Sequence, residues 1–409
     1  MKRKPWRMGI GAFWALVLAA SLSAHAQEWY VTPWIEARTE YNSNVLYTAE
    51  NEVDDIVLRI RPGFSAVYGM ERTRWTWDTA LEGQVYADNS GLNTVDVLST
   101  AGVVHQWTDR LSSRAGFYFL KDETLDSELQ ESGLYAKRET RYTYGPDFGI
   151  SYLLTDRVGI DGGLGLRRTD YDYDPYPDRT TWIATVSPYY MVTPRDRVGV
   201  SFGVSYSDYE NTSTIATFSN SLFWRRELAE SAYLLLSAGY RVTRTTLEEN
   251  SIQIVIDPIT NELFFVPITK ERSSSDLGFI FAATLVKELT ETVSVSLSAG
   301  RDQYNSVTAA SNERTFLRGT TSWRLSERTT AHLSAGYDYT TEEAGVGDEK
   351  THYVFLSPHI SYRLRQNLSL LGGAAYEHSF VDYASQDTDK NRQRLWAGLR
   401  YEWPRAWGN

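Results

Sequence analysis

From residue 27 onward, hydrophobic and polar residues alternate with a period of two, in segments of about 12 to 15 residues. The segment 74–86 is a clear example, because Trp75, Trp77 and Leu81 alternate with Asp78 and Glu82. This alternation predicts β-strands with one apolar and one polar face. A two-sheet sandwich and a closed membrane barrel both show the pattern, so the connections between strands must separate them.

The connections alternate between short and long. Tight turns such as 70–73, 155–157 and 194–197 are followed by longer loops such as 122–138 and 247–270. We place the strands near 30–42, 53–68, 73–87, 94–107, 111–122, 139–154, 158–171, 180–193, 198–209, 214–226, 231–245, 272–287, 292–304, 313–325, 329–341, 351–364, 367–383 and 391–403. Outer-membrane barrels have tight periplasmic turns and longer outer loops. We therefore predict an all-β, transmembrane, antiparallel up-and-down β-barrel of about 18 strands, with both ends of the mature chain on the periplasmic side.

A strand, a tight turn and a Gly/Ser-rich strand recur about every 40 residues, a period that propeller blades also show. The predicted strands are more than twice as long as blade strands of about 5 residues, and they have the length that a tilted strand needs to cross a bilayer. The repeat therefore favours the barrel over the propeller.

The amino terminus predicts export. Residues 1–26 carry four Lys and Arg, then an apolar run of about 15 residues, then Ala24-His25-Ala26, which fits a signal-peptidase site. The run is short of the roughly 20 residues of a membrane-spanning helix. We expect cleavage before Gln27, and a single barrel domain over 27–409.

Removal of residues 1–26 lowers the net charge from −11 to about −15, because that segment holds four cationic residues and no acidic one. A chain this acidic does not favour nucleic acid as a partner. It has no cysteine, which excludes disulfides and thiolate sites. Its aromatic content is 13%, with 27 Tyr and 13 Trp, the residues that concentrate at membrane–water boundaries.

The segment 391–403 alternates in the manner of the carboxy-terminal assembly strand of outer-membrane barrels. Pro404 has no backbone N–H to donate to a ladder. We predict that the ladder ends there and that 404–409 form a short periplasmic tail. We also expect the barrel to depend on the barrel-assembly machinery and to contact outer-membrane lipid and lipopolysaccharide.

The mature amino terminus resembles the β-barrel porin type 2 family. The resemblance rests on Glu40-Tyr41-Asn42-x-Asn44, on Asp54 and Asp55, and on Pro62-Gly63 before a basic turn. Members of that family are often associated with exopolysaccharide or exosortase loci. The resemblance therefore implies an outer-membrane conduit for a secreted polysaccharide, working with polysaccharide-export proteins, and it implies no catalytic residue.

A barrel of about 18 strands is wide enough for an aqueous channel, so function depends on the side chains that face the lumen. Alternation predicts that the pore-lining set is Arg59, Arg61, Arg74, Asp78, Glu82, Arg114, Asp147, Arg167, Arg241, Arg314, Arg318, Arg324, Asp338, Arg394 and Arg400. Arg outnumbers acidic residues in this set, which favours anionic solutes or an anionic polysaccharide. The alternative is that these charges are paired along a wide wall and have little electrostatic effect.

The longest loop, 247–270, is unusually apolar, and its alternating pattern predicts a hairpin. It can stand above the membrane, fold inward as a constriction, or pack on a partner. The residues of the candidate constriction are Ile252, Ile254, Ile256, Phe264 and Phe265.

The best candidate for catalysis is His359 as a base, with Ser357 or Ser361 as the nucleophile. The sequence shows neither a third residue to orient the histidine nor a nucleophile-elbow motif, so we predict no enzyme activity. The acidic loops lack the spacing of an EF-hand, and we predict no metal site and no cofactor. Two functions then remain: passive export of an exopolysaccharide, or general or anion-selective diffusion of small solutes.

Overall fold

The computed structural model describes residues 28–125, 129, 138–172, 176–210, 212–256, 263–305, 311–342, 349–383, 386–403 and 405–407. Side chains of strand residues 28–29, 248–271, 304–305, 311, 342, 349, 383, 386–387 and 405–407 are not described. The predicted signal segment, 1–26, lies outside the described residues. Within them, one antiparallel sheet contains every strand, and a single 3-10 turn, η1 (Ser90–Leu92), follows the third strand.

The first nine strands are β1 (Glu28–Asn42), β2 (Asp55–Met70), β3 (Thr73–Tyr86), β4 (Thr94–Thr108), β5 (Leu111–Glu123), β6 (Thr140–Leu153), β7 (Val158–Tyr171), β8 (Arg179–Thr193) and β9 (Asp196–Tyr209). The others are β10 (Ser213–Ala229), β11 (Ala232–Ile256), β12 (Leu263–Thr290), β13 (Val293–Asn305), β14 (Ser311–Arg324), β15 (Thr329–Glu342), β16 (Glu349–Arg365), β17 (Leu368–Tyr383), β18 (Gln386–Glu402) and the short β19 (Arg405–Trp407).

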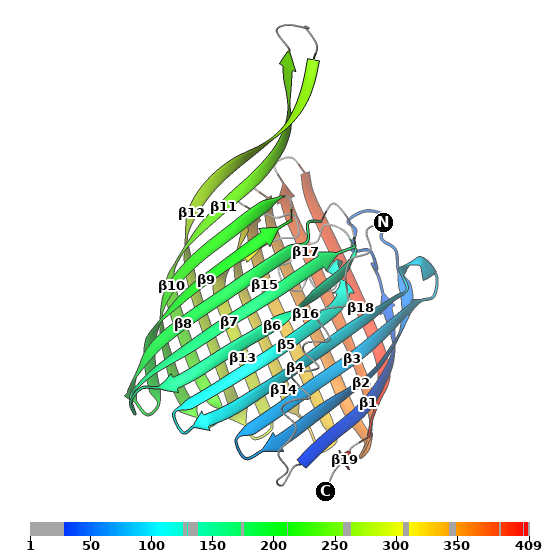
Figure 1. The fold of residues 1–409 in the computed structure, drawn as a ribbon. Coiled ribbons are helices and arrows are strands. Elements are labelled where there is room, and N and C mark those ends of the chain that lie inside the picture. The colour runs from blue at the N-terminus through cyan, green and yellow to red at the C-terminus, as the bar shows by residue number, and fades with distance from the viewer. Residues whose placement is uncertain are drawn as a thin grey trace.

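Each strand from β1 to β18 pairs with its neighbours in sequence, and β1 closes the sheet by pairing with β18 from Trp34↔Glu402 to Asn42↔Arg394. Figure 1 shows the resulting tilted barrel. Closure gives the terminal strands partners on both sides, as a sheet in lipid requires. The predicted closed, antiparallel, 18-stranded barrel is confirmed.

Short turns and long loops lie at opposite ends of the barrel (Figure 1). Only residues 71–72 separate β2 from β3, and only residues 194–195 separate β8 from β9, whereas residues 43–54 separate β1 from β2. The predicted alternation of short and long connections is therefore present.

The two faces of the wall differ as a membrane barrel requires. On β2, Asp55, Val57 and Arg59 are buried, while Ile56 and Ile60 are 53% and 43% exposed. On β18, Leu395 is 64% exposed, whereas Arg392 is buried. Apolar side chains on the outside and charged ones on the inside reverse the arrangement of a soluble domain.

The carboxy-terminal end corrects one prediction. Trp403 N–H donates to the carbonyl of Pro33, and β19 then pairs with Trp29–Val31 of β1. The ladder therefore resumes beyond residue 404, and the prediction that it ends at Pro404 is wrong, whereas the periplasmic position of 404–409 stays a prediction. Pro404 lacks one donor, but the residues on either side of it still have the N–H and C=O groups that a ladder needs.

Candidate functional site

The connection between β1 and β2 is tied to the opposite end of the chain. Asn44 is fully buried, its Nδ2 donates to the carbonyls of Thr48 (2.7 Å) and Asn391 (3.0 Å), and its Oδ1 accepts from Thr48 N–H. Ser43 and Gln393 exchange two further bonds of 3.0 and 2.9 Å. These contacts hold residues 43–48 against β18 and bury the hydrophobic residues that follow Asn44.

Tyr47 is the centre of that buried segment. It is 1% exposed, has a backbone φ of 52°, and its ring lies 5.3 Å from the guanidinium of Arg392 on β18. Burial, followed by the negative charge of Glu377, raises the pKa of Tyr47 above its usual range. The phenol is therefore neutral at physiological pH.

Tyr47 packs with residues from two walls of the barrel. It forms a buried hydrophobic cluster with Leu125 and Leu129, which follow β5, and with Tyr353 of β16, and Phe355 packs against it. Seven strand steps separate β5 from β16 through the closing pair β1–β18. A cluster that joins strands so far apart in the sheet narrows the lumen near the end that carries the long loops.

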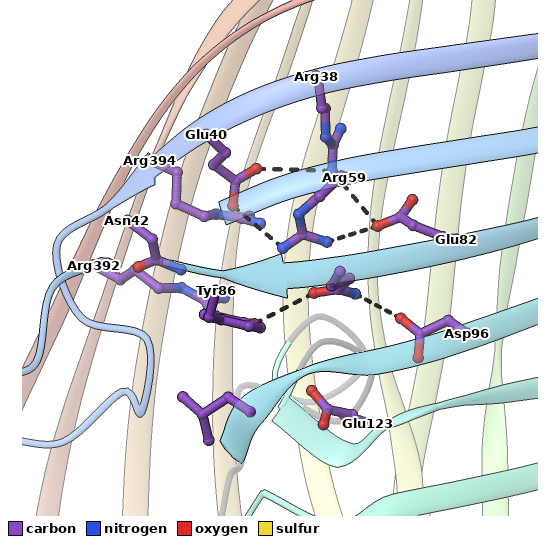
Figure 2. Close-up of polar contacts among 12 residues, drawn as sticks. Arg38, Glu40, Asn42, Arg59, Glu82, Tyr86, Asp96, Glu123, Arg392 and Arg394 are labelled. Carbon is purple, nitrogen blue, oxygen red and sulfur yellow. Dashed lines mark hydrogen bonds and ion pairs between the residues drawn. The ribbon is translucent and has the colours of Figure 1, made fainter. Parts of the chain in front are cut away.

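A layer of ion pairs lines the first wall. Arg59 Nη1 donates to Glu82 Oε1 at 2.7 Å, and Arg59 Nη2 donates to Glu40 Oε1 at 3.2 Å. Arg38 lies 3.7 Å from Glu40, and Arg61 lies 3.8 Å from Glu82. Figure 2 shows Arg59 between the carboxylates of Glu40 and Glu82. Two acids are thus shared among three arginines.

The second wall carries a matching set. Glu377 of β17 accepts from Arg392 at 2.5 Å and from Arg394 at 3.0 Å, both on β18. Arg318 of β14 donates to Asp338 of β15 at 2.9 Å. Arginines therefore equal or outnumber the acids in these pairs as well.

The two walls enclose one cavity, of about 630 Å³. It is lined by Arg38, Arg59, Arg61, Ala80, Glu82, Gln84, Asp96, Val97, Leu98, Leu120, Asp122, Arg318 and Arg394. Five arginines and three carboxylates line it, and Arg59, Arg318 and Arg394 also pair with Glu40, Asp338 and Glu377 beside it. We refer to this cavity as the arginine constriction.

The structure brings together five of the residues predicted from the sequence: Arg59, Arg61, Glu82, Arg318 and Arg394 all line the arginine constriction. Arg400 lines a neighbouring cavity. Arg241, Arg314 and Asp338 are held in ion pairs with Asp276, Asp302 and Arg318 respectively. Arg59, Arg241 and Asp338 are almost fully covered by their partners.

The other predicted residues follow the cross-strand register of the same inner face but lie outside both cavities. Arg114 pairs opposite Gly149 and Asp147 opposite Gly116 on the facing strands. The remaining four are Arg74, Asp78, Arg167 and Arg324. That these residues contact a passing solute stays a prediction.

Sequence reasoning missed Arg38, Asp96 and Asp122 of the arginine constriction and the cluster around Tyr47. The sequence alone gives the Asn42-x-Asn44 pattern no structural role beyond the family resemblance. Its physical meaning is now visible, because Asn42 Oδ1 accepts from Asn44 N–H and Asn44 fixes the buried turn. An asparagine pair at a strand end is a signal of such a turn.

The hairpin 247–270 takes the upright arrangement. β11 and β12 stay paired from Leu247↔Arg272 to Ile256↔Leu263, and Figure 1 shows this extension projecting away from the barrel. The side chains of the candidate constriction residues Ile252, Ile254, Ile256, Phe264 and Phe265 are outside the described part, as are residues 257–262. The narrowing that the structure does describe comes instead from residues 43–48, Leu125 and Leu129.

Among the described residues, no group of three or more His, Cys, Asp or Glu side chains is arranged to hold a metal ion. None of the helical segments in the described ranges is long and apolar enough to cross a membrane. His359, the candidate base, stacks on His332 with ring centres 4.6 Å apart.

No family model and no curated protein matches the chain. Solved structures do. Pseudomonas aeruginosa OccK2 (OpdF) is 9% identical with a TM-score of 0.43, over 91% of this chain and 98% of that one. Acinetobacter baumannii OccAB1 is 10% identical with a TM-score of 0.44, over 91% and 96%. The Escherichia coli K12 ferric-catecholate import receptor Fiu is 10% identical with a TM-score of 0.43, over 90% and 81%.

The architecture itself gives the location. A closed 18-stranded barrel with an apolar outer face and a charged interior is built to span the bacterial outer membrane. The protein is a bacterial outer-membrane β-barrel.

Proposed function

We propose that the protein is a diffusion porin whose constriction favours small anionic solutes. The observation that carries this proposal is the arginine constriction, where five arginines and three carboxylates from both walls line one cavity. A ring of charges at a narrow point controls selectivity, because a passing ion comes well within a Debye length of about 8 Å.

The paired charges do not cancel. Arg38, Arg59 and Arg61 share Glu40 and Glu82, so two negative charges face three positive charges. Because the cavity walls are protein of low dielectric, the remaining positive charge is screened less than it is at an open surface. An anion therefore enters at lower electrostatic cost than a cation of the same size.

The reversal potential across a planar bilayer with a salt gradient tests this proposal. The purified protein should prefer chloride to potassium, and Arg38→Glu with Arg61→Glu should shift the preference toward potassium. Arg110→Glu, at a short turn on the opposite end from the constriction, is the matched control, since Arg110 is 55% exposed and pairs only with Asp156 among the described residues. A cation-selective wild-type pore would refute the proposal.

Exopolysaccharide export is the second candidate, and its support is the family resemblance of residues 34–78. The hydrophobic cluster around Tyr47 favours small solutes over a polymer, because it occupies part of the lumen. A deletion strain that loses surface polysaccharide, and regains it with the intact gene, would favour export. A strain with normal polysaccharide would leave the diffusion porin as the function.

A further inference from the structure

A second cavity of about 690 Å³ adjoins the inner wall where the two ends of the chain meet. Its lining comes from β15, β16, β17, β18, β1 and the turn 366–367, with Arg38 and Arg394 shared with the arginine constriction. We refer to it as the seam cavity. It is distinct in composition, because serine hydroxyls, two side-chain amides and an indole line it beside the charged groups.

The indole of Trp396 lines this cavity beside Gly373. The position where a Cβ of Gly373 would stand is 2.5 Å from Trp396 Cζ2, so any larger residue at 373 would push the ring off the sheet. The ring of His359 is 6.1 Å from that of Trp396, and Arg38 is 5.5 Å from the ring centre. An aromatic face beside polar groups suits the C–H face of a ring-shaped polar ligand.

The charges of the seam cavity select for one negative charge. Arg38, Arg394 and Arg400 pair with acidic residues, which leaves the one positive charge of Arg363 without an acidic partner among the described residues. Such a balance is weak for a phosphate dianion and better matched to a monocarboxylate.

One guanidinium is available for that carboxylate. Arg394 pairs with Glu377, and Arg400 pairs with Glu36 and Glu402. Arg38 lies within 4.0 Å of Glu40 and Glu82. Arg363 makes no ion pair within the described residues, and it carries its charge at the edge of the same cavity. A guanidinium binds a carboxylate with two parallel hydrogen bonds.

The neutral groups match a ligand with several hydroxyls. Ser357, Ser361 and Ser369 each offer a donor and acceptors, and Gln366 and Asn367 offer both kinds of group. The three glutamates add acceptors for ligand hydroxyls. A plain fatty or aromatic acid would leave most of these polar groups without a ligand partner.

From these three features we infer that the seam cavity is a binding subsite for a sugar acid, a hydroxylated ring with one carboxylate. Trp396 contacts the ring face, Arg363 binds the carboxylate, and the serines and amides bind the hydroxyls. The inference rests on the proposed function, because it names the class of anion that the porin retains on its way through the lumen.

Saturation-transfer NMR on the purified protein in detergent tests this with three probes: galacturonate, galactose and acetate. Galacturonate should bind at least about tenfold more tightly than either of the others, since galactose lacks the carboxylate and acetate lacks both the ring and the hydroxyls. Trp396→Ala should weaken galacturonate binding by at least about tenfold, and Trp396→Phe should restore part of it. Arg363→Gln should bring galacturonate down to the affinity of galactose.

Trp323→Ala is the matched control, because Trp323 is exposed on the outer face of β14, and it should bind galacturonate as the wild type does. Equal binding of acetate and galacturonate, or unchanged binding in Trp396→Ala and Arg363→Gln, would overturn the inference. Binding is measured by NMR and ion selectivity by bilayer current, so the two proposals can fail separately. A chloride-selective pore that binds galacturonate no more tightly than galactose or acetate would refute the subsite alone. A cation-selective pore refutes the proposed function alone.

Discussion

The guanidinium of Arg392, near the end of the chain, lies 5.3 Å from the ring centre of Tyr47, near its beginning. A cation against an aromatic face is attractive, and it is more so when both are buried, as they are here. Arg392 is also held by Glu377 at 2.5 Å, so the stack rests on a fixed support. The contact keeps the buried segment 43–48 inside the barrel mouth.

Removal of the Tyr47 side chain should widen the pore. We expect Tyr47→Ala to raise single-channel conductance in a planar bilayer by roughly half or more, because the ring fills part of the narrow lumen. Tyr41→Ala, on the outer face of β1, is the control and should conduct as the wild type does. Unchanged conductance in Tyr47→Ala would show that the cluster does not limit the current.

Truncation of the central arginine should destabilise the barrel. Arg59→Ala leaves Glu40 and Glu82 without their closest cation, and breaking a buried pair in this way costs about 3–5 kcal/mol. Removal of the exposed pair partner in Arg110→Ala should cost about 0–1 kcal/mol. Urea unfolding in detergent, followed by tryptophan fluorescence, measures both, and equal stabilities of the two variants would contradict a structural role for Arg59.

The first residue of β2 predicts a pH dependence. Burial opposes the ionised form of Asp55, but hydrogen bonds from the Asn89 side chain and from the backbone N–H of Asp88, Asn89 and Ile56 outweigh it and lower its pKa below 3.8. Because the pKa is depressed in the folded state, this carboxylate stabilises the loop above pH 3.8, and the contribution is lost as the pH falls through the folded value.

The amide NMR shifts of Asp88 and Asn89 report that titration. Their midpoint should lie below pH 3.8 in the wild type, and the low-pH change should disappear in Asp55→Asn. A midpoint at or above 3.8 would mean that the hydrogen bonds do not favour the ionised form.

Deletion of the projecting hairpin should leave conductance unchanged. Residues 251–268 can be replaced by a two-residue turn, because Asn250 and Thr269 are paired and their ends are close together. The β11–β12 extension stands away from the barrel (Figure 1), so the current should not change in a planar bilayer. A rise in conductance would show that the hairpin enters the lumen.

Most of the wall was predictable from residue order alone. The predicted strand 158–171 coincides with β7 (Val158–Tyr171), because a strand with one face on lipid and one on water must alternate in sequence. The predicted strands 231–245 and 272–287 stop short of β11 and β12, because Glu248, Glu249, Lys270 and Glu271 interrupt the alternation there, and the upright extension of the hairpin 247–270 was one of three alternatives left open. Their pairing depends on the partner strand and not on a membrane face.

The candidate site was predictable only in part, for a different reason. Arg59 and Arg394 were found because alternation assigns each to the inner face. The segment around Tyr47 has no periodicity, and Asn44 finds its partner Asn391 at the other end of the chain. A contact of that sequence separation leaves no local pattern, since it depends on the closure of the whole sheet.

The closing pair of strands has a consequence for biogenesis. Arg38 and Arg59 lie near the amino terminus of the chain, and Arg394 and Arg400 lie near its carboxy terminus. Only the β1–β18 ladder and its β19 continuation bring these residues around common cavities. A partly inserted sheet therefore carries neither cavity, and it also leaves hydrogen-bonding edges without partners in lipid. Both cavities and the closed wall therefore form in the same event, when the last strand pairs with the first.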